Sequence, residues 1–214
     1  MMQFKIGEHW CEMDFCRGML GKCRFSLMDS PGVHDRLRVL LERCGSAGGV
    51  GDGAGDVLPH KRVKMAFAAC PNGCTLPHIK DVGFVAEICP RVLLESCDHC
   101  GMCVGVCRER AITMAVGGPE AARDKCVGCG MCMRDCPQQA IEGGAFRFAV
   151  LIGGRMGRHP RLADRMCVVG DRNLGRLVEK LLAAIDGHLN GNVRFADWIE
   201  QAGLFKVKEQ VLYG

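Results

Sequence analysis

The stretches CDHCGMCVGVC (residues 97–107) and CVGCGMCMRDCP (residues 126–137) decide how the middle of this chain folds. Each has the spacing Cys-x2-Cys-x2-Cys-x3-Cys, with glycine among the first three cysteines. One such loop can place three thiolates on one cubane, while the fourth cysteine points to the other cubane. The pattern therefore predicts two [4Fe–4S] clusters. The expected ligands are Cys97, Cys100, Cys103 and Cys136 for the first cluster, and Cys126, Cys129, Cys132 and Cys107 for the second.

A structural zinc site is the alternative for paired Cys-x2-Cys elements. Zinc would use four cysteines, so a third cysteine at the same spacing in each run would be surplus. The repeated match favours iron–sulfur clusters over zinc. Over residues 90–145 the chain resembles a bacterial-type two-cluster ferredoxin, with Arg108 standing where the second run has Pro137.

The composition of the 214-residue chain points to metal binding in a reducing compartment. Its sixteen cysteines far exceed ordinary use. Residues 1–10 lack the apolar run of a signal peptide, and no apolar stretch is long enough to span a bilayer. We therefore expect metal ligands rather than disulfides, in an anaerobic cytoplasm. The net charge of +4 is spread along the chain, which does not indicate nucleic acid but suits an anionic cofactor or substrate.

The hydrophobic pattern predicts helices and strands on both sides of the cysteine runs. Residues 1–30 are expected to form loops with one short strand, and the glycine-rich residues 45–56 a linker. Helices are expected over 31–44, 75–80, 173–188 and 195–202. Strands are expected over 62–68, 82–88, 92–95, 111–115, 140–142, 146–152 and 166–169.

This order of elements predicts an α+β fold with one unit inserted into another. The ferredoxin-like unit, residues 90–145, is expected to be βαββαβ-like. It interrupts a discontinuous domain formed by residues 1–89 and 146–214. The length of the chain allows two small domains of this kind.

Cysteines outside the two runs carry a second resemblance. The segment Ala69-Cys70-Pro71-Asn72-Gly73-Cys74, a Cys16-x6-Cys23 pair, Gly153-Gly154-Arg155-Met156-Gly157 and residues 194–204 resemble the siroheme-containing sulfite and nitrite reductases. A ferredoxin-like unit between the Cys-x3-Cys loop and the Gly-Gly segment is the arrangement of their anaerobic, ferredoxin-containing branch. The resemblance covers about residues 16–211 and implies a siroheme and [4Fe–4S] domain of that type.

The resemblance implies a third [4Fe–4S] cluster and a siroheme. The ligands of the third cluster would be Cys16, Cys23, Cys70 and Cys74. Cys74 would also bridge to the siroheme iron, with Asn72 beside it. Because siroheme carries eight carboxylates, Arg155 and Arg158 are candidates to bind it, with solvated surface arginines as the alternative.

Two departures from the family pattern leave alternatives open. The first cysteine pair has six intervening residues rather than five, and Cys11-x4-Cys16 is a competing pair. Only ten residues precede Cys11, whereas family members carry a sizeable region there that supplies most of the substrate-binding cations. We therefore expect an incomplete or low-activity reductase, unless a second copy or another subunit covers the siroheme. Cations of this chain could also replace that region: Arg17, Lys22, Arg24, Lys61, Arg62 and Lys64.

The resemblance implies six-electron reduction of sulfite to sulfide, or of nitrite to ammonia. Single electrons would come from a redox donor protein through the ferredoxin clusters. Two alternatives compete with this interpretation. One is a pure electron carrier without siroheme, and the other is a structural or regulatory metalloprotein without turnover.

Overall fold

The computed structural model describes residues 2–6, 9–28, 32–44, 62–188 and 194–213. The linker expected over 45–56, and Lys61, lie outside the described residues. The largest sheet has six strands in the order β1-β2-β3-β4-β9-β10. These strands are β1 (Met2–Ile6), β2 (His9–Phe15), β3 (Val63–Ala68), β4 (Val82–Glu87), β9 (Arg147–Ile152) and β10 (Asp164–Gly170). The β2–β3 and β3–β4 pairs are parallel, and the others are antiparallel.

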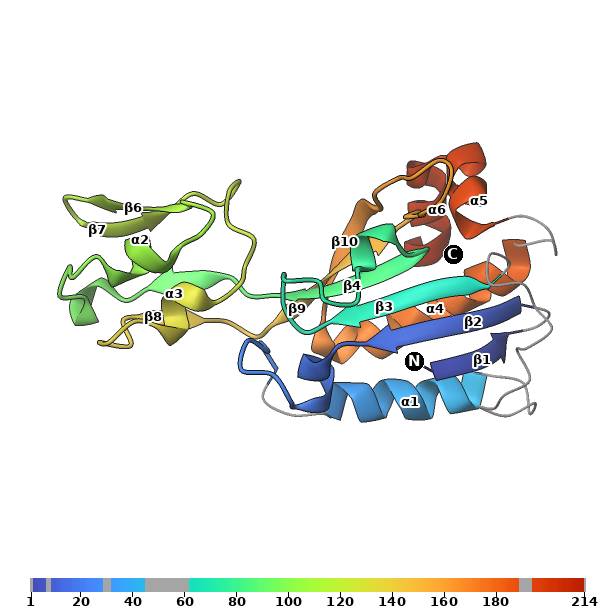
Figure 1. The fold of residues 1–214 in the computed structure, drawn as a ribbon, viewed down its shortest axis with the longest axis horizontal. Helices are drawn as coiled ribbons and strands as arrows, with labels where there is room; N and C mark the ends of the chain where they lie inside the picture. The colour runs from blue at the N-terminus through green and yellow to red at the C-terminus, as the bar shows by residue number, and fades with distance from the viewer. Residues whose placement is uncertain (1, 7–8, 29–31, 45–61, 189–193, 214) are drawn as a thin grey trace.

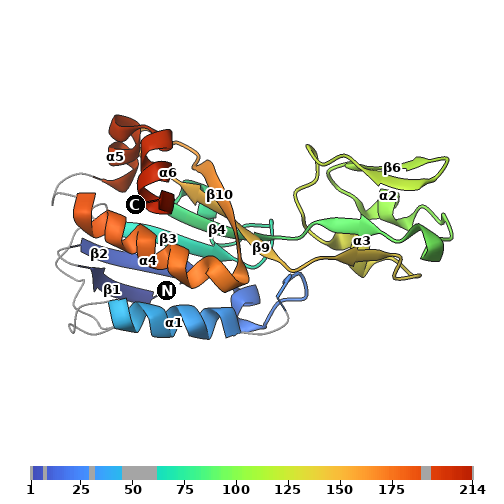
Figure 2. The ribbon, with the colours of Figure 1, turned by 180° about the vertical axis from the view of Figure 1, so that it is seen from behind.

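Two long helices lie across one face of this sheet (Figure 2). They are α1 (Gly32–Cys44) and α4 (Asp171–His188), and both have an apolar stripe. Buried leucines at positions 174, 177, 181 and 182 on α4 follow the helical period, which explains why this helix was predicted from the sequence. Two further helices, α5 (Phe195–Ala202) and α6 (Leu204–Tyr213), close the C-terminal part of the chain.

Four aromatic rings from adjacent strands form the centre of the core. Phe15, Phe67 and Phe84 are direct partners in the β2–β3–β4 register. The Phe67 and Phe84 rings are stacked with centroids 4.1 Å apart, and Phe148 meets Phe67 edge-on at 6.1 Å. Burial of Phe67, Phe84 and Phe148 holds the strands in a single register, because a one-residue slip would turn every ring to the opposite face.

A separate segment leaves the sheet between β4 and β9. These two strands pair along their whole length, from Val82↔Ile152 to Glu87↔Arg147, although 59 residues intervene between positions 87 and 147. The intervening segment contains β5 (Pro90–Val92), α2 (Met102–Val106), β6 (Ile112–Ala115), β7 (Gly118–Ala121), α3 (Met131–Arg134) and β8 (Ile141–Gly143). It projects from one end of the sheet (Figure 1). We call it the insert, and the remainder the sheet unit.

The mixed α+β class and the βαββαβ order of the insert are confirmed, but some elements differ from the prediction. Residues 1–30 contain two strands rather than one, because the short alternations at Phe4 and Ile6 and at Cys11 and Met13 bury one face of a hairpin. The strand expected over 92–95 is wrong: β5 ends at Val92 and a 3-10 turn follows over Leu94–Ser96. Helix α6 was missed, although its buried valines lie four residues apart.

No helix in the described part of the chain is both long enough and apolar enough to span a bilayer.

The buried carboxyl group of Asp81 should make the stability of the folded protein depend on pH. Its carboxylate is buried and accepts the Lys64 N–H at 2.8 Å, and burial raises its pKa to about 6. Below about pH 4 the Asp81 carboxyl is protonated in both the folded and the unfolded protein. Between pH 4 and 6 it ionises only in the unfolded protein, so the free energy of unfolding falls as pH rises. We expect a loss of about 3 kcal/mol across this window. Asp81→Asn, which cannot titrate, should lack this loss in denaturant unfolding at each pH. Parallel pH profiles for the two proteins would contradict the prediction.

Candidate metal centres

The two cysteine runs have closely similar local structures. Gly101 and Gly130 begin α2 and α3 with φ of 73° and 68°, a left-handed conformation that favours glycine. In each run the third cysteine lies on the short helix and the fourth follows it. The Ala111 N–H donates to Cys107 Sγ at 3.3 Å, and the Ala140 N–H donates to Cys136 Sγ at 3.3 Å. The repeated spacing therefore produces a repeated geometry, including a backbone donor to each fourth sulfur.

The cysteines of each run lie near one another inside the insert. Cys103 and Cys132 are buried in a small apolar cluster with Ile112 and Ile141. Burial raises the pKa of the Cys103 thiol, and the neighbouring Cys97 and Cys100 raise it further. Burial likewise raises the pKa of Cys132 to about 11, with further contributions from Cys129 and Cys126. The first three thiols of each run thus lie within electrostatic range of one another.

Cysteines of the sheet unit meet where β2 and β3 end. These strands are parallel neighbours, so their carboxyl ends lie at the same edge. Cys16 follows β2, and Cys70 lies two residues beyond β3. The Ala69 N–H donates to Cys16 Sγ at 3.1 Å, and the Cys16 N–H donates to Phe67 O at 3.1 Å. Strand pairing therefore brings together two cysteines that are 54 positions apart.

The same edge includes Cys23 and Cys74 but not Cys11. Burial raises the pKa of the Cys70 thiol, and charges on Cys16, Cys74 and Cys23 raise it further, so these three cysteines lie within electrostatic range of Cys70. Cys11 is fully buried within β2, and its pKa is raised by burial and by Asp81 rather than by another cysteine. Of the two pairings that the sequence leaves open, the geometry favours Cys16 with Cys23.

A cavity of about 340 Å³ lies between Cys70 and the insert. The sheet unit contributes Phe25, Cys70, Pro71 and Asn72 to its walls. The insert contributes Arg108, Glu109, Val127, Cys129 and Met131. The Cys74 thiol is exposed, whereas Cys70 is buried. Within the described residues, no three His, Cys, Asp or Glu side chains are arranged to hold a single metal ion.

The two arginines expected to bind siroheme, Arg155 and Arg158, follow β9. Gly153 follows Ile152, which pairs with Val82 at the beginning of β4, whereas Cys70 lies beyond Ala68, which pairs with Val85. Arg155 therefore lies at the opposite edge of the sheet from Cys70. Arg158 is exposed on the same segment as Arg155.

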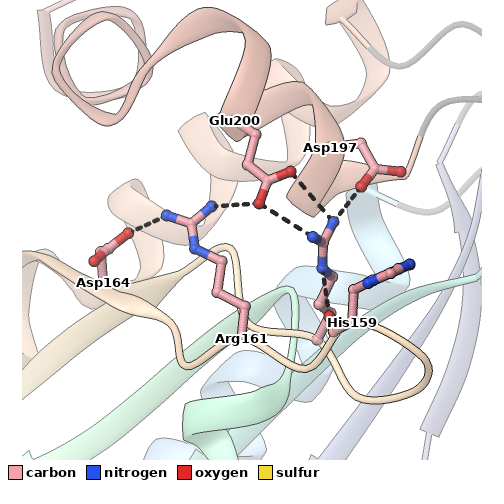
Figure 3. A network of polar contacts seen from close by, with 6 residues as sticks. His159, Arg161, Asp164, Asp197 and Glu200 are labelled. Atoms are coloured by element: carbon pink, nitrogen blue, oxygen red, sulfur yellow. Dashed lines mark hydrogen bonds and ion pairs between the residues drawn. The ribbon is translucent and has the colours of Figure 1, made fainter.

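Arg155 is held in a network of ion pairs with Asp197 and Glu200, which Figure 3 labels. Its guanidinium lies 2.5 Å from Asp197 Oδ1 and 3.2 Å from Glu200 Oε1, and its Nε donates to His159 O at 2.9 Å. Arg161 joins Glu200 and Asp164 in the same network. The planar fork of Arg155 is thus occupied by α5, and its role in this structure is to tie α5 to the segment after β9.

Replacing Arg155 should therefore affect stability. Arg155→Ala removes a cation from two half-exposed carboxylates, of which Glu200 keeps Arg161, and we expect a loss of about 1 kcal/mol that shrinks at high salt. The matched variant Arg158→Ala, on the same segment, should leave stability unchanged. Thermal unfolding of both variants at low and high salt measures the difference. Equal effects of the two substitutions would refute this assignment.

The alternative cations have different environments. Arg17, Lys22 and Arg24 are exposed around Cys16 and Cys23. Arg62 is paired with Glu12 at 2.5 Å, and the Lys64 side chain is partly buried on β3. The three exposed cations are therefore the ones available to an anion near the four cysteines.

Comparisons with known proteins give a consistent result. The sequence model of the family described as "Nitrite and sulphite reductase 4Fe-4S domain" matches residues 19–213. A curated relative, the "Coenzyme F420-dependent sulfite reductase" of Methanocaldococcus jannaschii, is 43% identical over 54 residues, which are 25% of this chain and 8% of that protein.

One solved structure shows the same fold. "Dissimilatory sulfite reductase I (DsrI)" has a TM-score of 0.61 at 15% identity, with 93% of this chain and 51% of that chain covered. The NirA protein of Mycobacterium tuberculosis has a TM-score of 0.47 at 17% identity, with 91% and 26% covered. The present chain thus spans about half of the DsrI chain and a small part of the curated relative.

Proposed function

Because the chain belongs to the nitrite and sulphite reductase 4Fe-4S domain family, we propose that it transfers electrons in the reduction of sulfite or nitrite. Membership of the family establishes an iron–sulfur redox role. The further proposal is that this role serves six-electron reduction of a small inorganic anion, with electrons supplied by a redox donor protein. The observation that carries it is the meeting of Cys16, Cys23, Cys70 and Cys74 at one edge of the sheet.

The donor set at this edge fits a [4Fe–4S] cluster. Four cysteine thiolates are what such a cluster requires, and a backbone N–H already donates to one of the sulfurs. Donors of this kind stabilise the negative charge that a cluster gains on reduction. Cys97, Cys100, Cys103 and Cys136, and Cys126, Cys129, Cys132 and Cys107, would hold the other two clusters. We also propose that residues 90–145 form a domain separate from residues 1–89 and 146–214.

Siroheme would be held at Cys74. The thiol of Cys74 is exposed rather than buried in the core, and Asn72 of the same loop lines the cavity. When bound, siroheme would supply the iron at which the anion is reduced. Arg17, Lys22 and Arg24 would pair with its carboxylates or with the anion, since the guanidinium of Arg155 is already occupied. A second copy or another subunit would complete the substrate site.

The second candidate function is an electron carrier with the family fold but without siroheme. It is favoured by the ion pairs of Arg155 with Asp197 and Glu200, which occupy a cation expected to bind siroheme. Both candidates use the same three cysteine quartets. They differ in whether Cys74 has an additional partner beyond the cluster.

Spectra of the anaerobically reconstituted protein, supplied with siroheme, test the proposal. We expect siroheme bands superimposed on the broad cluster absorption, and Cys74→Ser should remove or shift those bands while the iron of the insert remains. Cys89→Ser is the matched control, because Cys89 is also exposed but lies outside the quartets. Sulfite and nitrite turnover with an artificial donor then identifies the substrate. Absence of siroheme bands in the unmodified protein would contradict siroheme binding and support the electron carrier, and siroheme bands that are unchanged in Cys74→Ser would contradict the role of Cys74.

A further inference from the structure

The two cysteine runs follow the same backbone path but differ at one corresponding position. Position 99 in the first run is equivalent to position 128 in the second. Both have positive φ, 60° at His99 and 69° at Gly128. A histidine with an exposed side chain occupies this conformation in the first run, so the backbone alone does not demand glycine.

Contact with the sheet unit accounts for the glycine in the second run. A Cβ at Gly128 would lie 2.7 Å from Ile88 O and 2.9 Å from Glu87 Cβ. The Ile88 N–H also donates to Gly128 O at 2.9 Å. The second run is therefore packed directly against the end of β4, with no room for a side chain.

The neighbouring glycines show the same asymmetry. A Cβ at Gly130 would lie 2.9 Å from Leu27 Cδ2, whereas a Cβ at the equivalent Gly101 would meet nothing within 4 Å. Arg134, at the end of α3, donates to Arg24 O at 3.3 Å and lies 5.0 Å from the centroid of the Phe25 ring. Arg24 lies 4.8 Å from the same ring. Two guanidinium groups thus contact the Phe25 ring where the second run meets the loop after Cys23.

The cavity at this contact is lined, on the side of the insert, by residues around the second run and after Cys107. Cys129 of the second run and Cys70 of the sheet unit line it together. The insert residues in its wall either flank Cys126, Cys129 and Cys132 or, as Arg108 and Glu109 do, follow Cys107. Under the crossed ligand assignment these four cysteines hold one cluster. None of the lining residues is adjacent to Cys97, Cys100 or Cys103.

We propose that the cluster of Cys107, Cys126, Cys129 and Cys132 is the inner one, which exchanges electrons directly with the cluster of the sheet unit, and that Phe25 and Gly128 fix this contact. The cluster of the first run is then the outer one, which accepts electrons from a low-potential one-electron donor. Each step transfers one electron without making or breaking a bond: one cluster is oxidised by one electron as its neighbour is reduced by one. This inference rests on the proposed third cluster at Cys16, Cys23, Cys70 and Cys74.

Electron paramagnetic resonance of protein reduced with dithionite tests this order. Two paramagnetic clusters that are neighbours split each other's signals. In Cys97→Ser/Cys100→Ser, which removes the outer cluster, splitting between the remaining two clusters should persist. In Cys126→Ser/Cys129→Ser, which removes the inner cluster, splitting should be lost. Iron analysis first shows that each double variant has lost about four iron atoms.

A second pair of variants keeps all the ligands. Gly128→Ala and Gly101→Ala add the same methyl group at nearly the same positive φ, 69° and 73°, but only the former meets the backbone of Ile88. Gly128→Ala should weaken the splitting between the sheet-unit and inner clusters. Gly101→Ala should leave it unchanged. This comparison still decides the proposal if the ligand variants fail to fold.

The outcomes separate this inference from the proposed function. If the unmodified protein holds three clusters but Cys126→Ser/Cys129→Ser retains the splitting, the proposed order of the clusters is wrong and the proposed function stands. Equal effects of the two glycine variants would have the same meaning. Unmodified protein without iron at Cys16 and Cys70 would contradict the proposed function and this inference together.

Discussion

Replacing Cys16 and Cys70 with serine in one protein should remove about four of about twelve iron atoms, with an equal loss of inorganic sulfide. The two sulfurs lie at the same edge of the sheet, and each would bind a different iron atom of one cubane. The clusters of the insert should remain, because their ligands are held by a separate apolar core around Cys103 and Cys132. Iron and sulfide analysis of anaerobically purified protein measures the loss.

Cysteines outside the quartets are the controls. Cys44→Ser and Cys167→Ser change half-buried thiols elsewhere in the sheet unit and should keep the full iron content. Cys11→Ala tests the pairing that the sequence left open, and it should also keep all the iron, since Cys11 lies within the core. Iron loss in Cys11→Ala comparable to that in the double variant would show that Cys11 is a ligand. Full iron content in the double variant would exclude a cluster at this edge.

Gly83→Ala should destabilise the sheet unit by about 3 kcal/mol, or lower its thermal midpoint by about 10 °C. A Cβ at this position of β4 would lie 2.3 Å from Pro77 O and 2.8 Å from Pro77 Cβ. Both contacts involve a rigid residue, so the methyl group can be accommodated only if the segment after Cys74 moves. Because Pro77 is three residues from Cys74, the shift should also reduce iron bound by the sheet unit.

Gly170→Ala is the matched control, since Gly170 ends β10 and a Cβ there would meet nothing within 4 Å. We expect its thermal midpoint to stay within about 2 °C of the unmodified protein. Thermal unfolding under anaerobic conditions, with iron analysis before heating, measures both effects. Similar midpoints for the two variants would mean that the Pro77 segment is not packed tightly on β4.

Sequence patterns predicted those features whose determinants are close together in the chain. Each cysteine run contains its loop, its helix start and four cysteines within eleven residues, so its geometry follows from local spacing. The α4 helix follows from its own apolar period. The hairpin of β1 and β2 was missed because five- and seven-residue strands offer only short alternations.

The resemblance to reductases named the Cys16, Cys23, Cys70 and Cys74 quartet, but spacing alone left Cys11 as a competing partner. Tertiary structure separated the two. Parallel pairing of β2 with β3 brings Cys16 beside Ala69 and leaves Cys11 within the core. The residue types around Arg155 likewise gave no sign that Asp197 and Glu200, about forty positions away on α5, occupy it.

The sequence by itself determined two cysteine runs with equivalent ligand geometry, because each run folds around its own cluster site. It could not distinguish the roles of the two runs, since their spacing is identical. Tertiary structure alone decided that the second run packs against the sheet unit, through Gly128 at Ile88 and Arg134 at Phe25. The physical reason is that ligand geometry depends on neighbours within a few residues, whereas docking depends on close packing between surfaces that are distant in the chain.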